Sequence, residues 1–193
     1  VNADDGVTYP KVVGGYSHFV GLKSDGTVWT WGYNGNGQLG TGDQTNRTEP
    51  TKTKVEDAVD VTAGYYFTAI LKKDGTVWIS GDNTYGQLGD GTTTNSSEFK
   101  QVPNLTDVIQ ISAGSNTMHV LKKDGTVWSW GRNDCGEYGD GTTVSKEDLT
   151  PSQMIKVTNV MQIAAGNLHT AVLTAEGTVR AAGRNSDSQL GFV

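Results

Sequence analysis

Short apolar segments separated by glycine-containing turns follow one another along most of the chain. In the stretch 70–79, Ile-Leu-Lys-Lys leads into Asp-Gly, and Thr-Val-Trp-Ile follows. This pattern predicts a β-hairpin in which Asp74 and Gly75 form a two-residue type I′ turn and Leu71 lies opposite Trp78. Apolar residues then occupy both faces of the hairpin, as in a sheet covered on both sides. No segment shows a sustained helical period, so we expect little helix.

The hairpin pattern recurs four times, so the chain is built from repeats. Asp-Gly-Thr-Val-Trp begins at residues 25, 74 and 124, and the weaker copy Glu-Gly-Thr-Val-Arg begins at 176. Successive turn glycines are separated by 49, 50 and 52 residues. A second glycine, here called the repeat glycine, precedes each hairpin at positions 15, 64, 114 and 166. A third landmark follows each hairpin: Gly-Gln-Leu-Gly at 37–40 and 86–89, Gly-Glu-Tyr-Gly at 136–139 and Ser-Gln-Leu-Gly at 188–191.

Short strands repeated every ~50 residues and covered on both faces are typical of β-propeller blades. We therefore predict an all-β chain with an N-terminal segment at 1–10 and four propeller repeats at 11–57, 58–106, 107–158 and 159–193. WD-type propellers repeat roughly every 40–45 residues and contain Gly-His and Trp-Asp pairs. Neither pair occurs here. The double glycine of kelch repeats, followed by separated Tyr and Trp, is also missing, and a parallel β-helix would need much shorter rungs.

The fourth repeat differs from the others because it lacks their large aromatic side chains. Arg180 and Ala182 occupy the positions that hold tryptophan in earlier repeats: Trp29, Trp31, Trp78, Trp128 and Trp130. Such a loss is typical of a terminal repeat with one uncovered face. We therefore expect a partial propeller, completed by another copy, by a further part of the parent chain or by a partner. A closed four-bladed monomer is the alternative.

The repeats resemble a known family, that of the regulator of chromosome condensation repeat. Its pattern is close to Ala-Gly-Asn-Leu-His-Thr at 165–170, to the segment 121–133 and to Gly-Gln-Leu-Gly-Asp-Gly-Thr at 86–92. The resemblance covers residues 11–191. It implies a propeller, seven-bladed in the best-known members, and no single activity. Members include a nucleotide exchange factor for a small nuclear GTPase, enzyme inhibitors and repeat modules in ubiquitin ligases.

Composition and charge narrow the classes of function. The chain holds 26 Gly, about twice the average share, and 4 Pro, which suits a protein full of tight turns. A net charge of −6 argues against a nucleic-acid partner. No apolar run approaches the length that spans a membrane. The chain opens with Val-Asn-Ala rather than Met, so we expect a processed or excised start and favour a bacterial extracellular or cell-surface location.

Motifs that carry chemistry are weak in this sequence. The segment 35–40 matches Gly-x-Gly-x-x-Gly, but loop residues follow it where a dinucleotide site needs a helix. Asp90 and Asp140 each lie in a Gly-Asp-Gly-Thr loop, which offers one carboxylate where calcium needs several oxygen ligands. The single Cys135 permits no internal disulfide, and His18, His119 and His169 do not form a ligand cluster. We expect no catalytic, cofactor or metal site and a structural role for the histidines.

The tryptophans and tyrosines suggest different roles. The tryptophans recur at fixed places in the hairpins, so we expect them in the core rather than on a sugar-binding surface. The end of the blades opposite the Asp-Gly turns is where the repeats differ most, and exposed Tyr and Arg often anchor interfaces. The candidate partner-binding residues at this end are Tyr16, Tyr65, Tyr66, Tyr33, Asp82, Arg132 and Arg184.

The most favoured function is a non-enzymatic scaffold that binds another protein through this loop end. A guanine-nucleotide exchange factor is one alternative, although the even repeat spacing leaves no room for a large inserted element. A carbohydrate-binding module of a secreted bacterial protein is another, with Tyr65, Tyr66 and Tyr85 as the candidate stacking residues.

Overall fold

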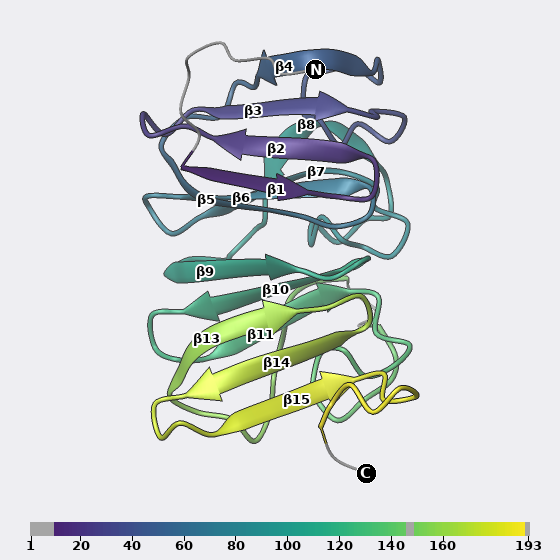
Figure 1. Ribbon diagram of the computed structural model, residues 1–193. Coiled ribbons are helices and arrows are strands. Elements are labelled where there is room, and N and C mark those ends of the chain that lie inside the picture. Colours follow the sequence, from purple (N-terminus) through teal and green to yellow (C-terminus); the bar gives the residue numbers. More distant parts are fainter. Residues whose placement is uncertain (1–9, 146–148, 192–193) are drawn as a thin grey trace.

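The computed structural model describes residues 10–145 and 149–191, and strands are the regular secondary structure of these residues. They form four antiparallel sheets in the order of the chain, which we call blades 1 to 4 (Figure 1). Blade 1 contains β1 (Lys11–Gly14), β2 (His18–Leu22), β3 (Val28–Gly32) and β4 (Arg47–Lys52). Blade 2 contains β5 (Ala58–Ala63), β6 (Phe67–Lys72), β7 (Val77–Gly81) and β8 (Ser96–Gln101). Blade 3 contains β9 (Val108–Ala113), β10 (Thr117–Lys122), β11 (Val127–Gly131) and β12 (Ser152–Gln153), and blade 4 contains β13 (Val160–Ala165), β14 (His169–Thr174) and β15 (Val179–Gly183).

The blades follow one another as an arc, with blade 1 at the top of Figure 1 and blade 4 at the bottom. The innermost strands contact in succession, β1 with β5, β5 with β9 and β9 with β13. Among the described residues, the strands of blade 4 do not pack on those of blade 1 as those of successive blades do, and the two blades lie at opposite ends of the arc (Figure 1). The prediction of an all-β chain of propeller blades is confirmed, and the arc is a partial propeller rather than a closed four-bladed ring.

The turn of each hairpin corrects the predicted register. Leu71 pairs with Val77 and Ile70 with Trp78, one residue away from the expected pairs. Gly75 has a φ of 79°, and its N–H donates to the carbonyl of Lys72, so the loop has three residues, a type I turn closed by a left-handed glycine. The carboxylate of Asp74 accepts hydrogen bonds from both the N–H and the hydroxyl of Thr76. Blade 4 has the same register with Glu176 at this place, so the left-handed glycine rather than the aspartate is what the four turns share.

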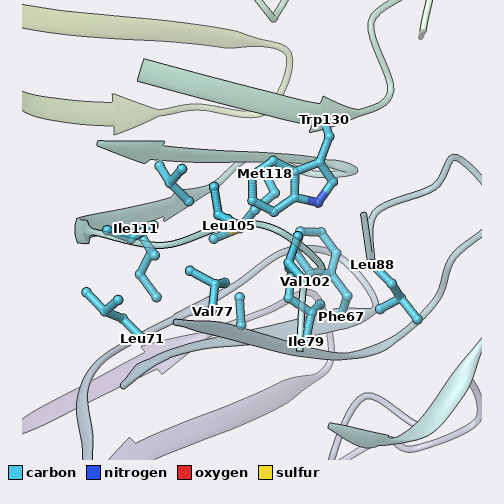
Figure 2. Packing of buried hydrophobic residues seen from close by; sticks show 13 residues of the cluster. Phe67, Leu71, Val77, Ile79, Leu88, Val102, Leu105, Ile111, Met118 and Trp130 are labelled. Atoms are coloured by element: carbon cyan, nitrogen blue, oxygen red, sulfur yellow. The ribbon is translucent and has the colours of Figure 1, made fainter. Parts of the chain in front are cut away.

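Apolar side chains pack between successive blades rather than within one sheet. The largest cluster joins blades 2 and 3, where Phe67, Ile79 and Leu88 meet Met118 and Trp130 (Figure 2). Smaller clusters join blades 1 and 2 and blades 3 and 4. Each internal sheet is therefore covered on both faces, as the hairpin pattern predicted.

The tryptophans divide into two groups, which corrects the expectation that all belong to the core. Trp130 is fully buried, whereas Trp29, Trp31, Trp78 and Trp128 are half-buried. The indole N–H of Trp78 bonds to the hydroxyl of Thr76 near the turn, and Lys72 lies over the ring, which packs against the cluster between blades 1 and 2. Tryptophan near the Asp-Gly turn thus covers the edge of the core.

Two negative findings concern the residues that the structure describes. Among the described residues, no helix is long and apolar enough to cross a membrane. No group of three or more His, Cys, Asp or Glu side chains in the same ranges is placed to hold a metal ion.

Candidate interaction surface

The loops that contain the repeat glycines of the four blades lie together at the same end of the blades, to the right in Figure 1. The residue after each repeat glycine donates its N–H to the carbonyl of its counterpart in the next blade: Tyr16 to Tyr65 at 3.2 Å, Tyr65 to Ser115 at 2.8 Å and Ser115 to Asn167 at 3.1 Å. A side chain at a repeat glycine would prevent this approach, since a Cβ on Gly114 would lie 2.8 Å from the carbonyl oxygen of Gly166. The loops enclose a hollow of about 450 Å³ at the centre of the arc.

Four of the predicted tyrosines form one cluster beside this hollow, which we call the tyrosine cluster. The ring centroids of Tyr16 and Tyr65 are 5.3 Å apart, and those of Tyr16 and Tyr66 are 5.6 Å apart. Tyr33 comes from the loop after β3 and lies 6.0 Å from Tyr66, edge to face. Tyr16 is 65% exposed, Tyr33 and Tyr65 are also exposed, and Tyr66 is half-buried beneath them. Blades 1 and 2 thus present a continuous aromatic surface that no other part of the described chain covers.

The other three candidates are separate from the tyrosine cluster. Asp82 is buried, and its carboxylate accepts hydrogen bonds from Gln87 at 2.9 Å and from Thr84 at 2.6 Å, inside its own loop. Arg132 is held by Asp134 at 2.7 Å, a hydrogen bond that raises the pKa of the guanidinium, and it lies 5.3 Å from the ring centroid of Tyr85.

Arg184 is exposed on blade 4 and pairs with Asp187 of its own loop at 3.4 Å. Asp82 therefore supports its loop from inside, whereas the two arginines are available at the surface. The contact between Arg132 and Tyr85 was not predicted, and it joins the loops of blades 2 and 3.

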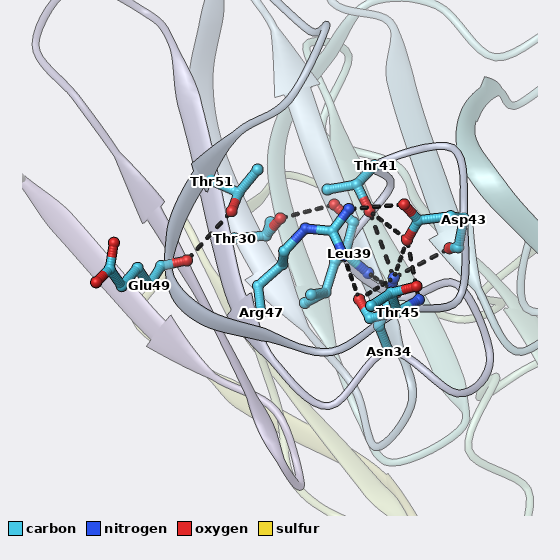
Figure 3. A network of polar contacts seen from close by, with 9 residues as sticks. All are labelled: Thr30, Asn34, Leu39, Thr41, Asp43, Thr45, Arg47, Glu49 and Thr51. Carbon is cyan, nitrogen blue, oxygen red and sulfur yellow. Dashed lines mark hydrogen bonds and ion pairs between the residues drawn. The ribbon is translucent and has the colours of Figure 1, made fainter.

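An asparagine holds the loop after the third strand of each blade, buried in blades 1 to 3 and half-buried in blade 4, a feature that the sequence reasoning missed. In blade 1, the side-chain oxygen of Asn34 accepts from the N–H of Leu39, and its amide donates to the carbonyls of Asp43 and Thr45 (Figure 3). Asn83 and Asn133 make the equivalent contacts in blades 2 and 3, and Asn185 accepts from Leu190 in blade 4. The signal was an Asn two residues after the glycine that ends each third strand.

The two buried histidines connect neighbouring blades. His18 Nε2 lies 2.9 Å from the hydroxyl of Thr68, and the ring of His119 lies 2.8 Å from both Ser129 and Thr170. Burial lowers the pKa of His18 to about 4 and that of His119 to about 3, so both rings are neutral at pH 7. His169 and Cys135 are half-buried, and the thiol of Cys135 is free. The histidine contacts support the structural role that was expected.

The chain resembles several solved propellers in fold. Human WBSCR16 matches with a TM-score of 0.86 and 24% identity over 99% of this chain and 51% of its own. Prp20p from Saccharomyces cerevisiae, studied with its binding properties to Gsp1p and histones, matches with a TM-score of 0.82 and 23% identity over 98% of this chain and 46% of its own. Yeast RCC1 (Prp20) bound to Kap60 gives a TM-score of 0.83 and 21% identity over 96% of this chain and 46% of its own. The chain spans about half the length of these structures.

Sequence comparison identifies the repeat itself. The pattern described as the regulator of chromosome condensation (RCC1) repeat matches residues 25–71, 74–121 and 124–173, and a second form of it matches residues 11–38, 58–87, 108–137 and 160–189. These matches coincide with the hairpins and loops of the four blades. The chain belongs to the family of the regulator of chromosome condensation (RCC1) repeat.

Proposed function

We propose that this chain is a non-enzymatic scaffold that binds another protein through the loop end of its blades. The observation that carries this proposal is the tyrosine cluster, in which Tyr16, Tyr33 and Tyr65 expose their rings while packing on Tyr66. Packed aromatic rings lose little side-chain freedom on binding, and Tyr is enriched among residues that dominate interfaces.

Similarity to known propellers supports a protein partner in general terms. The related yeast structures concern complexes with, or binding to, Kap60, Gsp1p and histones. These relatives are less than a quarter identical to this chain, so their partners are not assigned to it. The non-enzymatic part of the proposal rests on His18 and His119, which are buried with hydroxyl partners.

The experiment is to isolate the protein captured by the immobilised chain and then to measure its affinity as a purified partner. The double variant Tyr16→Ala and Tyr65→Ala should weaken binding at least tenfold, since each ring is expected to contribute about 1 kcal/mol or more. Lys73→Ala and Lys123→Ala form the matched control, because both lysines are exposed at the opposite end of the blades. Equal affinity for the tyrosine and lysine variants would refute the proposed surface. If the chain bound a glycan instead of a protein, and the tyrosine variant lost that binding, the carbohydrate-binding alternative would be favoured.

A further inference from the structure

One buried polar group beneath the tyrosine cluster lacks a hydrogen-bond partner. Gln38, in the loop after β3, is fully buried, and among the described residues no group forms a hydrogen bond with its side-chain Nε2. The Oε1 atom of the same side chain accepts from the N–H of Asn36 at 3.0 Å, which fixes the direction of the amide. An amide nitrogen carries two N–H donors, and leaving them buried without an acceptor destabilises the fold. Such a group in a folded protein calls for an explanation.

Blade 2 shows which group is missing. Gln87 is the equivalent of Gln38, and its Oε1 accepts from the N–H of Tyr85 in the same way. The Nε2 of Gln87 donates to the carboxylate of Asp82 at 2.9 Å and lies 3.4 Å from the side-chain oxygen of Asn116. The buried amide at this place therefore binds a carboxylate when the chain provides one.

Blade 1 provides neither of these acceptors. Tyr33 stands at the position of Asp82, and Tyr66 stands at that of Asn116. The ring centroids of the two tyrosines are 6.0 Å apart. Because both belong to the tyrosine cluster, the amide of Gln38 lies under the same surface that we assign to the partner. An aromatic ring accepts an N–H group only weakly, so the two rings do not replace the missing carboxylate.

Tyr33 is the residue that moves if a ligand is to reach the amide. Its ring is 41% exposed and lies across Gly35, where a Cβ would clash with the tyrosine hydroxyl. Blade 2 holds Thr84 at the place of Gly35, and the hydroxyl of Thr84 donates to the carboxylate of Asp82 at 2.6 Å. Exposed side chains change rotamer within nanoseconds or so, which means that the ring of Tyr33 can turn aside over a low barrier. Its hydroxyl is a donor for an entering carboxylate, as that of Thr84 is for Asp82.

The chemistry around the cluster favours an acidic ligand over a basic one. The three loops that carry the tyrosines, residues 15–17, 33–38 and 64–66, contain no charged side chain. A basic group would therefore find no counter-ion in them, and the ring contacts at 5.3–6.4 Å leave no open cage for a cation. The groups that these loops do offer are hydroxyl and amide donors, which form stronger hydrogen bonds with a carboxylate than with a neutral oxygen.

We propose that the partner protein inserts the side chain of an Asp or Glu between Tyr33 and Tyr66, where its carboxylate accepts the hydrogen bonds of the Gln38 amide. Apolar residues beside that acidic residue pack on the exposed rings of Tyr16 and Tyr65. This inference rests on the proposed function, because it names the group through which the partner is held.

The probe is the peptide Gly-Ser-Leu-Asp-Leu-Ser-Gly with blocked ends, and the same peptide with Asn in place of Asp is the matched ligand. Binding to the 193-residue chain is followed by nuclear magnetic resonance, in which the side-chain amide of Gln38 gives its own signal. The Asp peptide should shift that signal and bind about fivefold more tightly than the Asn peptide, because a charged acceptor forms the stronger hydrogen bond.

A substitution of the amide tests its role directly. Gln38→Glu keeps the acceptor for the N–H of Asn36 but removes the donor, so the preference for the Asp peptide should disappear. Blade 3 carries Glu137 at the same place, so we expect the variant to fold. Gln189→Glu, at the equivalent place in blade 4, is the matched control and should leave the preference unchanged.

Tyr33→Asp supplies the missing carboxylate from the chain itself and so tests the site without any ligand. The variant should melt at a higher temperature than Tyr33→Ala, because only the aspartate gives the buried amide an acceptor. It should also lose the preference for the Asp peptide, whereas Tyr33→Ala should keep it. A melting temperature no higher than that of Tyr33→Ala would show that the amide does not bind a carboxylate.

The peptide experiments can also overturn the inference. Equal affinities for the two peptides, an unchanged Gln38 signal in both titrations, or an Asp preference that survives in Gln38→Glu would each do so. The proposed function is tested separately from this inference. A captured partner whose binding is weakened by Tyr16→Ala with Tyr65→Ala, but not by Gln38→Glu, would uphold the tyrosine cluster as the binding surface and overturn the bound carboxylate.

Discussion

Replacing Trp130 by Phe tests whether the core between blades depends on one polar contact. The indole is fully buried, and its N–H is bonded to the carbonyl of Gln87 at 2.8 Å, beside Leu88 and Val102 (Figure 2). Phe keeps most of the apolar ring but leaves that carbonyl buried without its donor. An unsatisfied buried acceptor costs about 1–3 kcal/mol. The smaller ring also removes roughly two carbon groups from the core, at about 0.8 kcal/mol each.

The free energy of unfolding should therefore fall by about 3 kcal/mol. Trp128→Phe is the matched control two residues away on the same strand. The ring of Trp128 is half-buried, and its N–H bonds to the hydroxyl of Thr126, which lies near solvent. Its loss should cost less than about 1 kcal/mol, because water replaces the lost partner.

Guanidinium unfolding followed by circular dichroism measures both variants. The midpoint should shift while the slope with denaturant stays constant, which shows that the change is one of stability. Equal losses for the two variants would refute the reasoning, because they would mean that the contact between blades adds nothing beyond the area of the ring.

Further predictions concern pH, one carboxyl group and the surface. The pKa values of His18 and His119 are lowered by burial to about 4 and about 3, so the folded state binds fewer protons than the unfolded chain. The stability that these rings contribute is complete above pH 6.5 and is lost as the pH falls, by about 2 kcal/mol for each ring at pH 5. The melting temperature measured by calorimetry should therefore fall between pH 7.5 and pH 5. A constant melting temperature over this range would contradict the reasoning. Burial raises the pKa of Glu137, whose Oε1 has no hydrogen-bond partner, so stability should fall as the pH rises through that pKa. Glu137→Gln, which restores the residue found at Gln87, should raise the unfolding free energy at pH 7 by about 1 kcal/mol in urea titrations, and an unchanged value would argue against a charged buried group. Tyr66→Ala should lower affinity for a protein partner by about 1 kcal/mol or more, because three exposed tyrosine rings pack on this one, and should lower the unfolding free energy by about 1 kcal/mol; an unchanged affinity would contradict the role of the tyrosine cluster.

The repeats and the fold could be predicted from the sequence because glycines mark each blade at three places with nearly constant spacing. The hairpin register could not, because a left-handed glycine fits both a two-residue and a three-residue loop and the apolar pattern does not decide between them. The apolar pattern also could not predict how burial changes along a strand. Trp128 and Trp130 share one face of β11, yet only Trp130 is covered by the loop of the preceding blade.

The candidate surface was predicted in part. Repeat alignment placed the four tyrosines at one end of the blades, and the structure brings their rings together. The same alignment placed Asp82 with them, although Gln87 and Thr84 turn its carboxylate inward. Contacts of this kind depend on the path of a loop, which repeat spacing does not determine.

The buried asparagines have a consequence for how this surface can change. Each holds its loop through main-chain atoms, so we expect the backbone to keep its path when the side chains at the two positions after the asparagine change. Those two intervening positions are Gly-Asn, Thr-Tyr, Asp-Cys and Ser-Asp in the four blades. Each blade therefore works as a fixed frame around a short variable segment, as antibody domains do with their loops. Selection, natural or in a library, can therefore alter recognition at these pairs of positions one blade at a time while the fold stays the same.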